Sequence, residues 1–275
     1  MSTFKIVSDS SSDIREFSAA FSSVPLKIRT DEREFCDDDT LNLSEMLTYL
    51  EKYKGKSGSA CPNTAEWLEA FEGYENIFCV TITSSLSGSY NSAYGAAKEY
   101  MEKYPERHVL VIDSLSTGPE CALVIEKLGQ LISEGKSFDE ISAEIKEYQK
   151  HTHLIFALES MHNLANNGRV SPIAAKLAGV IGIRIVGKAS DEGTLEIMNK
   201  SRGAKRMLED IIDNMKKTGC GGKVRIHHCE NPAVSEKLEA LIKEMFPETS
   251  VVISTVGGLC GFYAERGGVL IGYES

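Results

Sequence analysis

Residues 76–92 read NIFCVTITSSLSGSYNS, and this stretch decides the fold. A β-branched apolar run is followed by five hydroxyl residues in the seven positions 83–89, and then by a helical pattern over 90–104. An apolar strand that passes through a short polar loop into a helix is the first half of a βαβ unit. The stretch therefore predicts a parallel sheet whose strands are joined by helices.

The same succession occurs three times in the first half of the chain. The expected strands are 4–7, 76–82 and 108–113, their loops are 8–13, 83–89 and 114–118, and their helices are 14–21, 90–104 and 119–135. A further strand over 23–28 and a helix starting at Pro62 and Asn63 are expected between the first two units. Strands with a nearly continuous apolar character indicate a parallel sheet covered by helices on both faces.

The second half has a different pattern. Asp191-Glu192-Gly193 separates two strand-like runs, 181–189 and 194–200, and is a strong hairpin signal. Hairpin and βα units together predict a mixed sheet with helices on one face. We expect an α/β protein of two domains, 1–150 and 151–275, divided at the polar segment around residue 150.

Charge and cysteine content limit the classes of function. The chain of 275 residues has a net charge of −10, which argues against binding to nucleic acid and against anchoring on an anionic membrane. The N-terminal segment lacks a cleavable signal pattern, and the seven cysteines contain no CxxC pair. These features predict reduced thiols and a cytoplasmic protein.

The loop over 83–89 is the strongest candidate for a binding site. Ligands of open α/β sheets bind beyond the carboxyl ends of the strands, and a helix N-terminus there favours an anion. The hydroxyls of Ser84, Ser85, Ser87 and Ser89 would donate hydrogen bonds, and Gly88 would let the backbone come close. Alternatively, one serine caps the helix and the others are solvated turn residues.

Motifs for nucleotide, metal and hydrolytic chemistry are missing from the sequence. Gly55-Lys56-Ser57 lacks the P-loop glycine five residues before Gly55, because Leu50 is there. Ser87 lacks the flanking glycines of a nucleophile elbow. His227 and His228 are neighbours on a predicted strand and so point to opposite faces. We therefore expect no metal, no cofactor and no catalytic residue.

Two arginines and one cysteine are further candidates. A carboxylate buried in the crevice needs a cation or several donors, and either Arg169 or Arg202 could be that cation. Cys61 precedes a helix N-terminus, which can activate a thiol. A hydrolase or transferase acting on a small anion through Ser87 or Cys61 therefore remains an alternative.

The chain resembles the DegV family along almost its whole length. The resemblance rests on SSLSGSYNSA (84–93), IVSDSSSDI (6–14), NGRVS (167–171) and a C-terminal strand preceded by two glycines. DegV proteins are bacterial fatty-acid-binding proteins, and some are the lipid-carrying subunit of fatty acid kinase. The resemblance implies a three-layer α/β/α domain and a two-layer α/β domain that enclose one acyl chain.

The resemblance also implies a set of site residues. Ser87 and Ser59 would hold the fatty-acid carboxylate, and Arg202 and Arg169 match the arginines of the family. Tyr263 occupies the position of a family histidine; it can donate a hydrogen bond but cannot become cationic. The lining of the acyl chain is expected to include residues 174–183.

The implied function is that of a binding subunit and not of a stand-alone enzyme. Such a protein presents a long-chain fatty acid to a fatty acid kinase catalytic subunit, which makes an acyl phosphate. Contact with a membrane would be transient at most. Because Tyr263 departs from the family pattern, a regulatory module for another amphiphile remains a second alternative.

Overall fold

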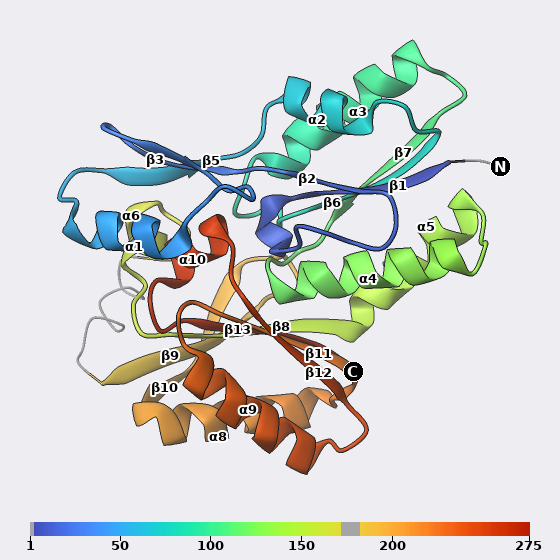
Figure 1. Cartoon of the computed structure of the whole chain (residues 1–275). Coiled ribbons are helices and arrows are strands. Elements are labelled where there is room, and N and C mark those ends of the chain that lie inside the picture. The colour runs from blue at the N-terminus through green and yellow to red at the C-terminus, as the bar shows by residue number, and fades with distance from the viewer. Residues whose placement is uncertain (1–2, 172–181) are drawn as a thin grey trace.

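The computed structural model describes residues 3–171 and 182–275 (Figure 1). Its strands are β1 (Phe4–Asp9), β2 (Phe21–Val24), β3 (Lys27–Thr30), β4 (Glu34–Cys36), β5 (Ser57–Ala60), β6 (Asn76–Thr81), β7 (His108–Asp113), β8 (Thr152–Leu158), β9 (Ile183–Ala189), β10 (Leu195–Arg202), β11 (Gly221–His228), β12 (Ser250–Thr255) and β13 (Val269–Glu274). Its helices are α1 (Leu43–Lys52), α2 (Thr64–Phe71), α3 (Ser89–Lys103), α4 (Pro119–Ser133), α5 (Phe138–Tyr148), α6 (His162–Asn166), α8 (Gly203–Thr218), α9 (Pro232–Met245) and α10 (Gly258–Ala264), with the 3-10 turns η1 (Ser10–Ser12) and η2 (Gln149–His151).

The first half is built on a four-stranded parallel sheet in the order β2-β1-β6-β7. Alternate residues of β6 point to opposite faces of this sheet. Ile77 packs with Trp67 of α2, and Phe78 packs with Val124 of α4. Helices α2 and α3 thus cover one face and α4 and α5 the other (Figure 1), which confirms the predicted three layers.

The second half is built on a six-stranded mixed sheet in the order β10-β9-β8-β13-β11-β12. Ile155 and Ile271 face α8 and α9, whereas Phe156 and Leu270 face the first half of the chain. The predicted hairpin is confirmed, since β9 and β10 pair antiparallel across a turn in which Gly193 has a φ of +75°. The mixed sheet with helices on one face is also confirmed.

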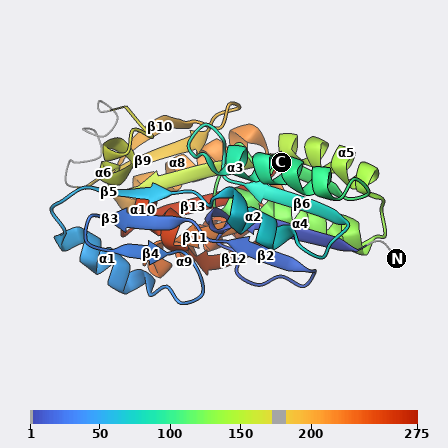
Figure 2. The ribbon, with the colours of Figure 1, turned by 90° about the horizontal axis from the view of Figure 1, so that it is seen from above.

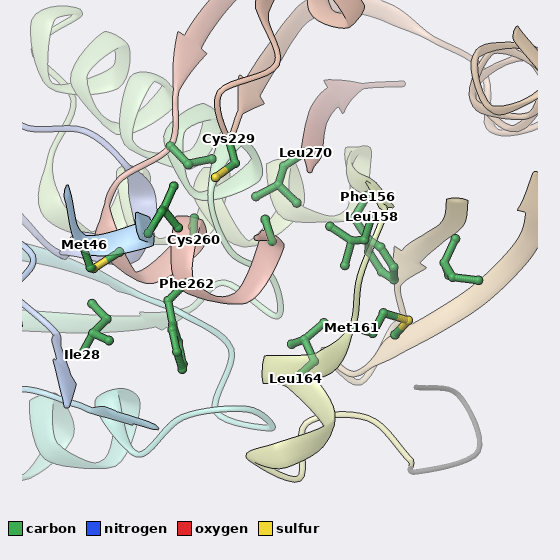
Figure 3. Packing of buried hydrophobic residues seen from close by; sticks show 14 of the residues in the cluster. Ile28, Met46, Phe156, Leu158, Met161, Leu164, Cys229, Cys260, Phe262 and Leu270 are labelled. Atoms are coloured by element: carbon green, nitrogen blue, oxygen red, sulfur yellow. The ribbon is translucent and has the colours of Figure 1, made fainter. Parts of the chain in front are cut away.

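A small antiparallel sheet, β4-β3-β5, was not predicted. Seen from above (Figure 2), this sheet and α1 lie at one end of the molecule beside α6 and α10, while α4 and α5 form the other end. Ile28 and Met46 belong to one apolar cluster with Phe156 and Phe262 (Figure 3). Residues before 150 thus share a core with the second half, and the domain boundary stays a prediction.

Two predicted elements near the N-terminus are wrong. The helix expected over 14–21 is absent: η1 ends at Ser12, the following residue Asp13 adopts a φ of +61°, and residues 21–24 form β2. The strand expected over 23–28 is divided at Pro25 between β2 and β3, which belong to different sheets. Proline lacks the N–H that a continuous ladder needs.

None of the helices in the described part of the chain has both the length and the apolar composition that crossing a membrane requires.

Candidate functional site

A cavity lies between the six-stranded sheet, the small sheet and the hydroxyl-rich loop after β6. The space, with its open mouth included, is about 650 Å³. Its apolar wall is formed by Leu26, Ile82, Leu86, Leu154, Phe156, Leu158, Leu164, Leu195, Leu259, Cys260, Ala264 and Leu270. Figure 3 shows part of this wall. Both halves of the chain contribute, so the site exists only in the complete fold.

The period of a β-strand explains why leucines from β8 enter the cavity. Leu154, Phe156 and Leu158 are two residues apart and so share one face of the sheet. Leu270 of β13 is paired with Phe156 and points the same way. The intervening Ile155 packs under α8 and α9 instead. One face of β8 is therefore an apolar floor for a ligand.

Polar side chains gather where the cavity meets the surface. Leu86, Ser87 and Arg169 line both the cavity and an open surface depression, which we call the head-group depression. The other residues of the head-group depression are Ser84, Ser85, Gly88, Asn91 and Gly168. The apolar space thus has a polar mouth at the Ser-rich loop.

Ser87 is held at this mouth by the start of α3. Its N–H donates to the Thr83 carbonyl oxygen at 3.2 Å, and its Oγ accepts from the Ser89 N–H at 3.3 Å. Gly88 caps α3 without a side chain, and a Cβ there would lie 3.3 Å from Cys61 Sγ. The helix N-terminus is therefore left open beside the Ser87 hydroxyl, which favours an anion.

Ser59 and Tyr263 come together on the wall of the same cavity, although 204 positions separate them in the sequence. Ser59 lies on β5 and Tyr263 on α10, and their hydroxyl oxygens are 2.8 Å apart. Either hydroxyl can donate, so the pair can offer a proton to a ligand oxygen.

The two predicted arginines differ in position. Arg169 is half-buried at the mouth, where its Nε donates to the Leu86 carbonyl oxygen at 3.2 Å and its Nη1 donates to the Asn167 carbonyl oxygen. Arg202 is exposed at the far end of β10 from Leu195, roughly 20 Å along the strand. Arg202 does not line the cavity, so the structure does not support the prediction that it contacts the head group.

The reason for this difference is the orientation of the β9–β10 hairpin. Its turn, and not the other end of β10, lies against the Ser-rich loop, because the Ser85 hydroxyl donates to the Glu192 carbonyl oxygen at 2.6 Å. Ser84 is exposed in the head-group depression and its N–H donates to Asp113 Oδ1 at 3.1 Å. Ser84 therefore lies outside the cavity.

The N-terminal hydroxyl-rich loop has no ligand-facing hydroxyl. The Ser11 and Ser89 hydroxyls both donate to Asp9, at 2.5 Å, and the Ile82 N–H donates to it at 3.0 Å. Complete burial raises the pKa of Asp9, and these hydrogen bonds oppose the rise. The carboxylate ties the loop after β1 to the loop after β6.

A second buried carboxylate, Asp37, positions the helix that carries Tyr263. It accepts from the Gly258 N–H at 2.6 Å and the Leu259 N–H at 2.9 Å, and it also binds Ser10 and Arg15. Burial raises the pKa of Asp37, and the Arg15 cation opposes this rise. Sequence reasoning missed this role because Asp37 lies in a run of acidic residues that reads as solvated surface.

Hydrolytic chemistry finds no support in these contacts. Among the described residues that line the cavity there is no histidine and no carboxylate, so no general base adjoins Ser87. The Cys61 thiol packs with Leu26 and Ile82. Thr117, which the sequence did not single out, also lines the cavity, 3.6 Å from Cys260 Sγ. Residues 174–181 of the predicted lining lie outside the described residues.

The chain belongs to the DegV family. The family model described as "Uncharacterised protein, DegV family" matches residues 3–275. A DegV domain-containing protein of Streptococcus pneumoniae is 42% identical over 278 residues, which cover 99% of both chains.

Two solved structures are similar over the whole chain. A DegV family protein from Eubacterium eligens loaded with heptadecanoic acid has a TM-score of 0.98 and 46% identity, over 99% of this chain and all of that one. The Fatty Acid Kinase (Fak) B3 protein of Streptococcus pneumoniae loaded with linoleic acid has a TM-score of 0.97 and 42% identity, over 99% of each chain.

Proposed function

We propose that this protein encloses one long-chain fatty acid and presents its carboxylate to a separate, ATP-dependent fatty acid kinase, which phosphorylates it to an acyl phosphate. The observation that carries the proposal is the apolar cavity whose polar mouth holds Ser87, Arg169 and the Ser59–Tyr263 pair. Similar proteins support it, since one is loaded with heptadecanoic acid and another is a fatty acid kinase B3 protein loaded with linoleic acid.

Each mouth residue has a proposed role. The hydroxyls of Ser87 and Ser59, with Tyr263, donate to the carboxylate, while Arg169 supplies a positive charge. Gly88 leaves the α3 N-terminus accessible, and Ser84 belongs to the outer surface that a kinase would approach. The carboxylate would then lie where the cavity meets the head-group depression.

The acyl chain and the carboxylate contribute differently to the binding free energy. Burying a methylene contributes about 0.8 kcal/mol, so an acyl chain of roughly fourteen methylenes offers on the order of 11 kcal/mol before the cost of ordering. A hydrogen bond to a charged group contributes about 1.5–3 kcal/mol. The tail therefore supplies most of the affinity, and the polar mouth fixes which end of the ligand faces outward.

The protein would act as a binding subunit in the cytoplasm, with the kinase as its partner. No ligand-activating base lines the described part of the cavity, so phosphoryl transfer would come from the partner. Exchange of fatty acid would need at most a transient encounter with a membrane.

The test is extraction followed by mass spectrometry. The purified protein is denatured and its lipid is quantified; we expect one fatty acid per chain, and uptake of one oleate after delipidation. Absence of bound lipid together with absence of uptake would overturn the proposal. Binding without phosphorylation by a fatty acid kinase and ATP would instead indicate a regulatory module for the same amphiphile.

A further inference from the structure

The head-group depression adjoins the place where the fatty-acid carboxylate would lie. It shares Leu86, Ser87 and Arg169 with the acyl cavity, so the two spaces meet at these three residues. In the proposed reaction a carboxylate oxygen forms a bond to the γ-phosphorus of ATP, and the bond from that phosphorus to ADP breaks, its electron pair leaving on ADP. Because the apolar wall of the cavity disfavours a charged group, the added phosphoryl group extends outward into the head-group depression.

The polar side chains of the head-group depression can all donate hydrogen bonds. They are the hydroxyls of Ser84, Ser85 and Ser87, the amide of Asn91 and the guanidinium of Arg169. The Ser85 hydroxyl already donates to the β9–β10 turn. The side chains of Ser84 and Asn91 have no hydrogen-bond partner in the described part of the chain, and neither lines the acyl cavity. Their donors are therefore available to a group outside the cavity.

The charge of the head-group depression also favours an anion. Among its described lining residues there is no carboxylate, although the chain has 40 acidic residues and a net charge of −10. Arg169 binds two backbone carbonyl oxygens and pairs with no carboxylate of the described residues, so its charge is not neutralised by an ion pair. A second surface depression is instead lined by Asp113, Glu120 and Asp191.

The first turn of α3 bounds the head-group depression through Asn91. Gly88 caps this helix without a side-chain hydrogen bond. The first N–H groups of a helix have no acceptor within the helix and carry a partial positive charge. A phosphoryl group in the depression would therefore adjoin both the Arg169 guanidinium and the positive end of α3.

We propose that the head-group depression is the subsite for the phosphoryl group of the acyl phosphate; this inference rests on the proposed function. Ser84 and Asn91 donate to phosphoryl oxygens, and Arg169 contributes its charge before and after phosphoryl transfer. A phosphate group carries about −1.5 to −2 charges and three strong acceptor oxygens, more than the carboxylate that it modifies. The outer donors therefore stabilise the bound product and do not contact the bound fatty acid.

The variant Asn91→Asp tests this subsite. It keeps the size of the side chain and places a negative charge in the head-group depression. The two ligands are palmitate and a stable analogue of palmitoyl phosphate, in which a methylene replaces the oxygen between the carbonyl carbon and phosphorus. Competition titration should show the affinity for the analogue, relative to palmitate, falling about tenfold because like charges repel at short range.

Ser92→Asp is the matched control. Ser92 is the next residue of α3, and it does not line the head-group depression. The variant adds the same charge near the same helix end, but outside the proposed subsite, so the relative affinity should stay within about twofold of wild type. Equal changes in the two variants, or an unchanged relative affinity in Asn91→Asp, would overturn the inference.

A measurement on the wild-type protein covers the case in which a variant does not fold. Replacing bound palmitate by the phosphonate analogue should shift the NMR signals of the Asn91 side-chain amide and leave those of Asn214, on α8, unchanged. An unchanged Asn91 signal would contradict the inference while leaving fatty-acid binding intact. Failure of the wild type to bind palmitate would count against the proposed function itself.

Discussion

Two loops of nearly equal composition have different roles in this molecule. The loop after β1, SDSSSD over 8–13, has its hydroxyls engaged by protein acceptors: Ser10 donates to Asp37, Ser11 to Asp9, and Ser12 to the Asp9 carbonyl oxygen. The loop after β6, TSSLSGS over 83–89, places the Ser87 hydroxyl on the cavity wall. The first loop therefore stabilises the fold, and the second is a candidate ligand-binding loop.

The comparison shows that acceptors, and not hydroxyls, decide the role of such a loop. Asp9 and Asp37 are fully buried beside the first loop and take its donors. Ser87 has no carboxylate partner among the described residues, so its donor proton remains available to a ligand. Substitutions in the first loop should therefore change stability, and a substitution of Ser87 should change ligand binding.

The largest effect is expected at Asp9. In Asp9→Ala the hydroxyls of Ser11 and Ser89 and the Ile82 N–H lose their acceptor while remaining buried. Breaking such a buried charged network costs about 3–5 kcal/mol, to be measured as the free energy of unfolding in urea. Asp9→Asn, which keeps an acceptor oxygen, should lose clearly less. Near-equal stability of wild type and Asp9→Ala would contradict the claim that the loop after β1 has a structural role.

Glu120, in the first turn of α4 directly after the loop over 114–118, should make the stability of the protein depend on pH. Burial raises the pKa of Glu120 to about 7, and a hydrogen bond from the Thr152 hydroxyl opposes the rise. Because the folded state holds a proton that the unfolded state releases near pH 4.5, the contribution to stability is full below that pH and is lost as the pH rises through about 7. Glu120→Gln should abolish this loss.

The size of this effect follows from the shift in pKa. Between pH 5 and pH 8 the wild type should lose about 2–3 kcal/mol of unfolding free energy relative to Glu120→Gln. Urea titrations across this range measure the difference, with the exposed Glu99→Gln as control. Parallel stability curves for wild type and Glu120→Gln would show that Glu120 does not titrate in this way.

A smaller loss of stability is expected at Ser10. Its hydroxyl donates to Asp37 Oδ2 at 2.8 Å and accepts from the Leu26 N–H at 3.0 Å, both in the interior. Ser10→Ala should therefore lower the free energy of unfolding by about 1–3 kcal/mol, measured by chemical denaturation. Fatty-acid affinity should stay within twofold of wild type. A large loss of affinity with unchanged stability would place the first loop in the binding site.

Ser87→Ala should give the opposite result. Losing one hydrogen bond to a carboxylate weakens palmitate binding about tenfold, or about 1.4 kcal/mol, by competition titration. Stability should change by less than about 0.5 kcal/mol. Ser84→Ala, in the head-group depression but outside the cavity, is the control and should leave affinity within twofold. Equal effects of the two substitutions would contradict the assignment of Ser87.

Local patterns predicted much of this fold. The apolar runs at β6 and β7, the proline that opens α4 and the Gly193 turn all depend on neighbours in the sequence. The helix α10 could not be predicted in this way. It contains Gly258 and Gly261, which disfavour a helix, and its first N–H groups are bound by Asp37 from 221 positions away. A cap supplied by tertiary structure leaves no local signal.

The candidate site was predictable to the extent that its motifs are short. Ser87 and Gly88 lie within one loop, and that loop identified them. Tyr263 reaches Ser59 only because α10 folds next to β5, and no local sequence pattern predicts this contact. For Arg202 the sequence predicts a hairpin but does not show which of its ends faces the Ser-rich loop.

A crystal structure of the protein loaded with palmitate tests the central claim most directly. The account predicts the carboxylate within about 3.2 Å of Ser87 Oγ, beside the Ser59–Tyr263 pair, with the acyl chain along the apolar face of β8. Palmitate bound only on the outer surface, or palmitate bound in the cavity with its methyl end at Ser87, would contradict it.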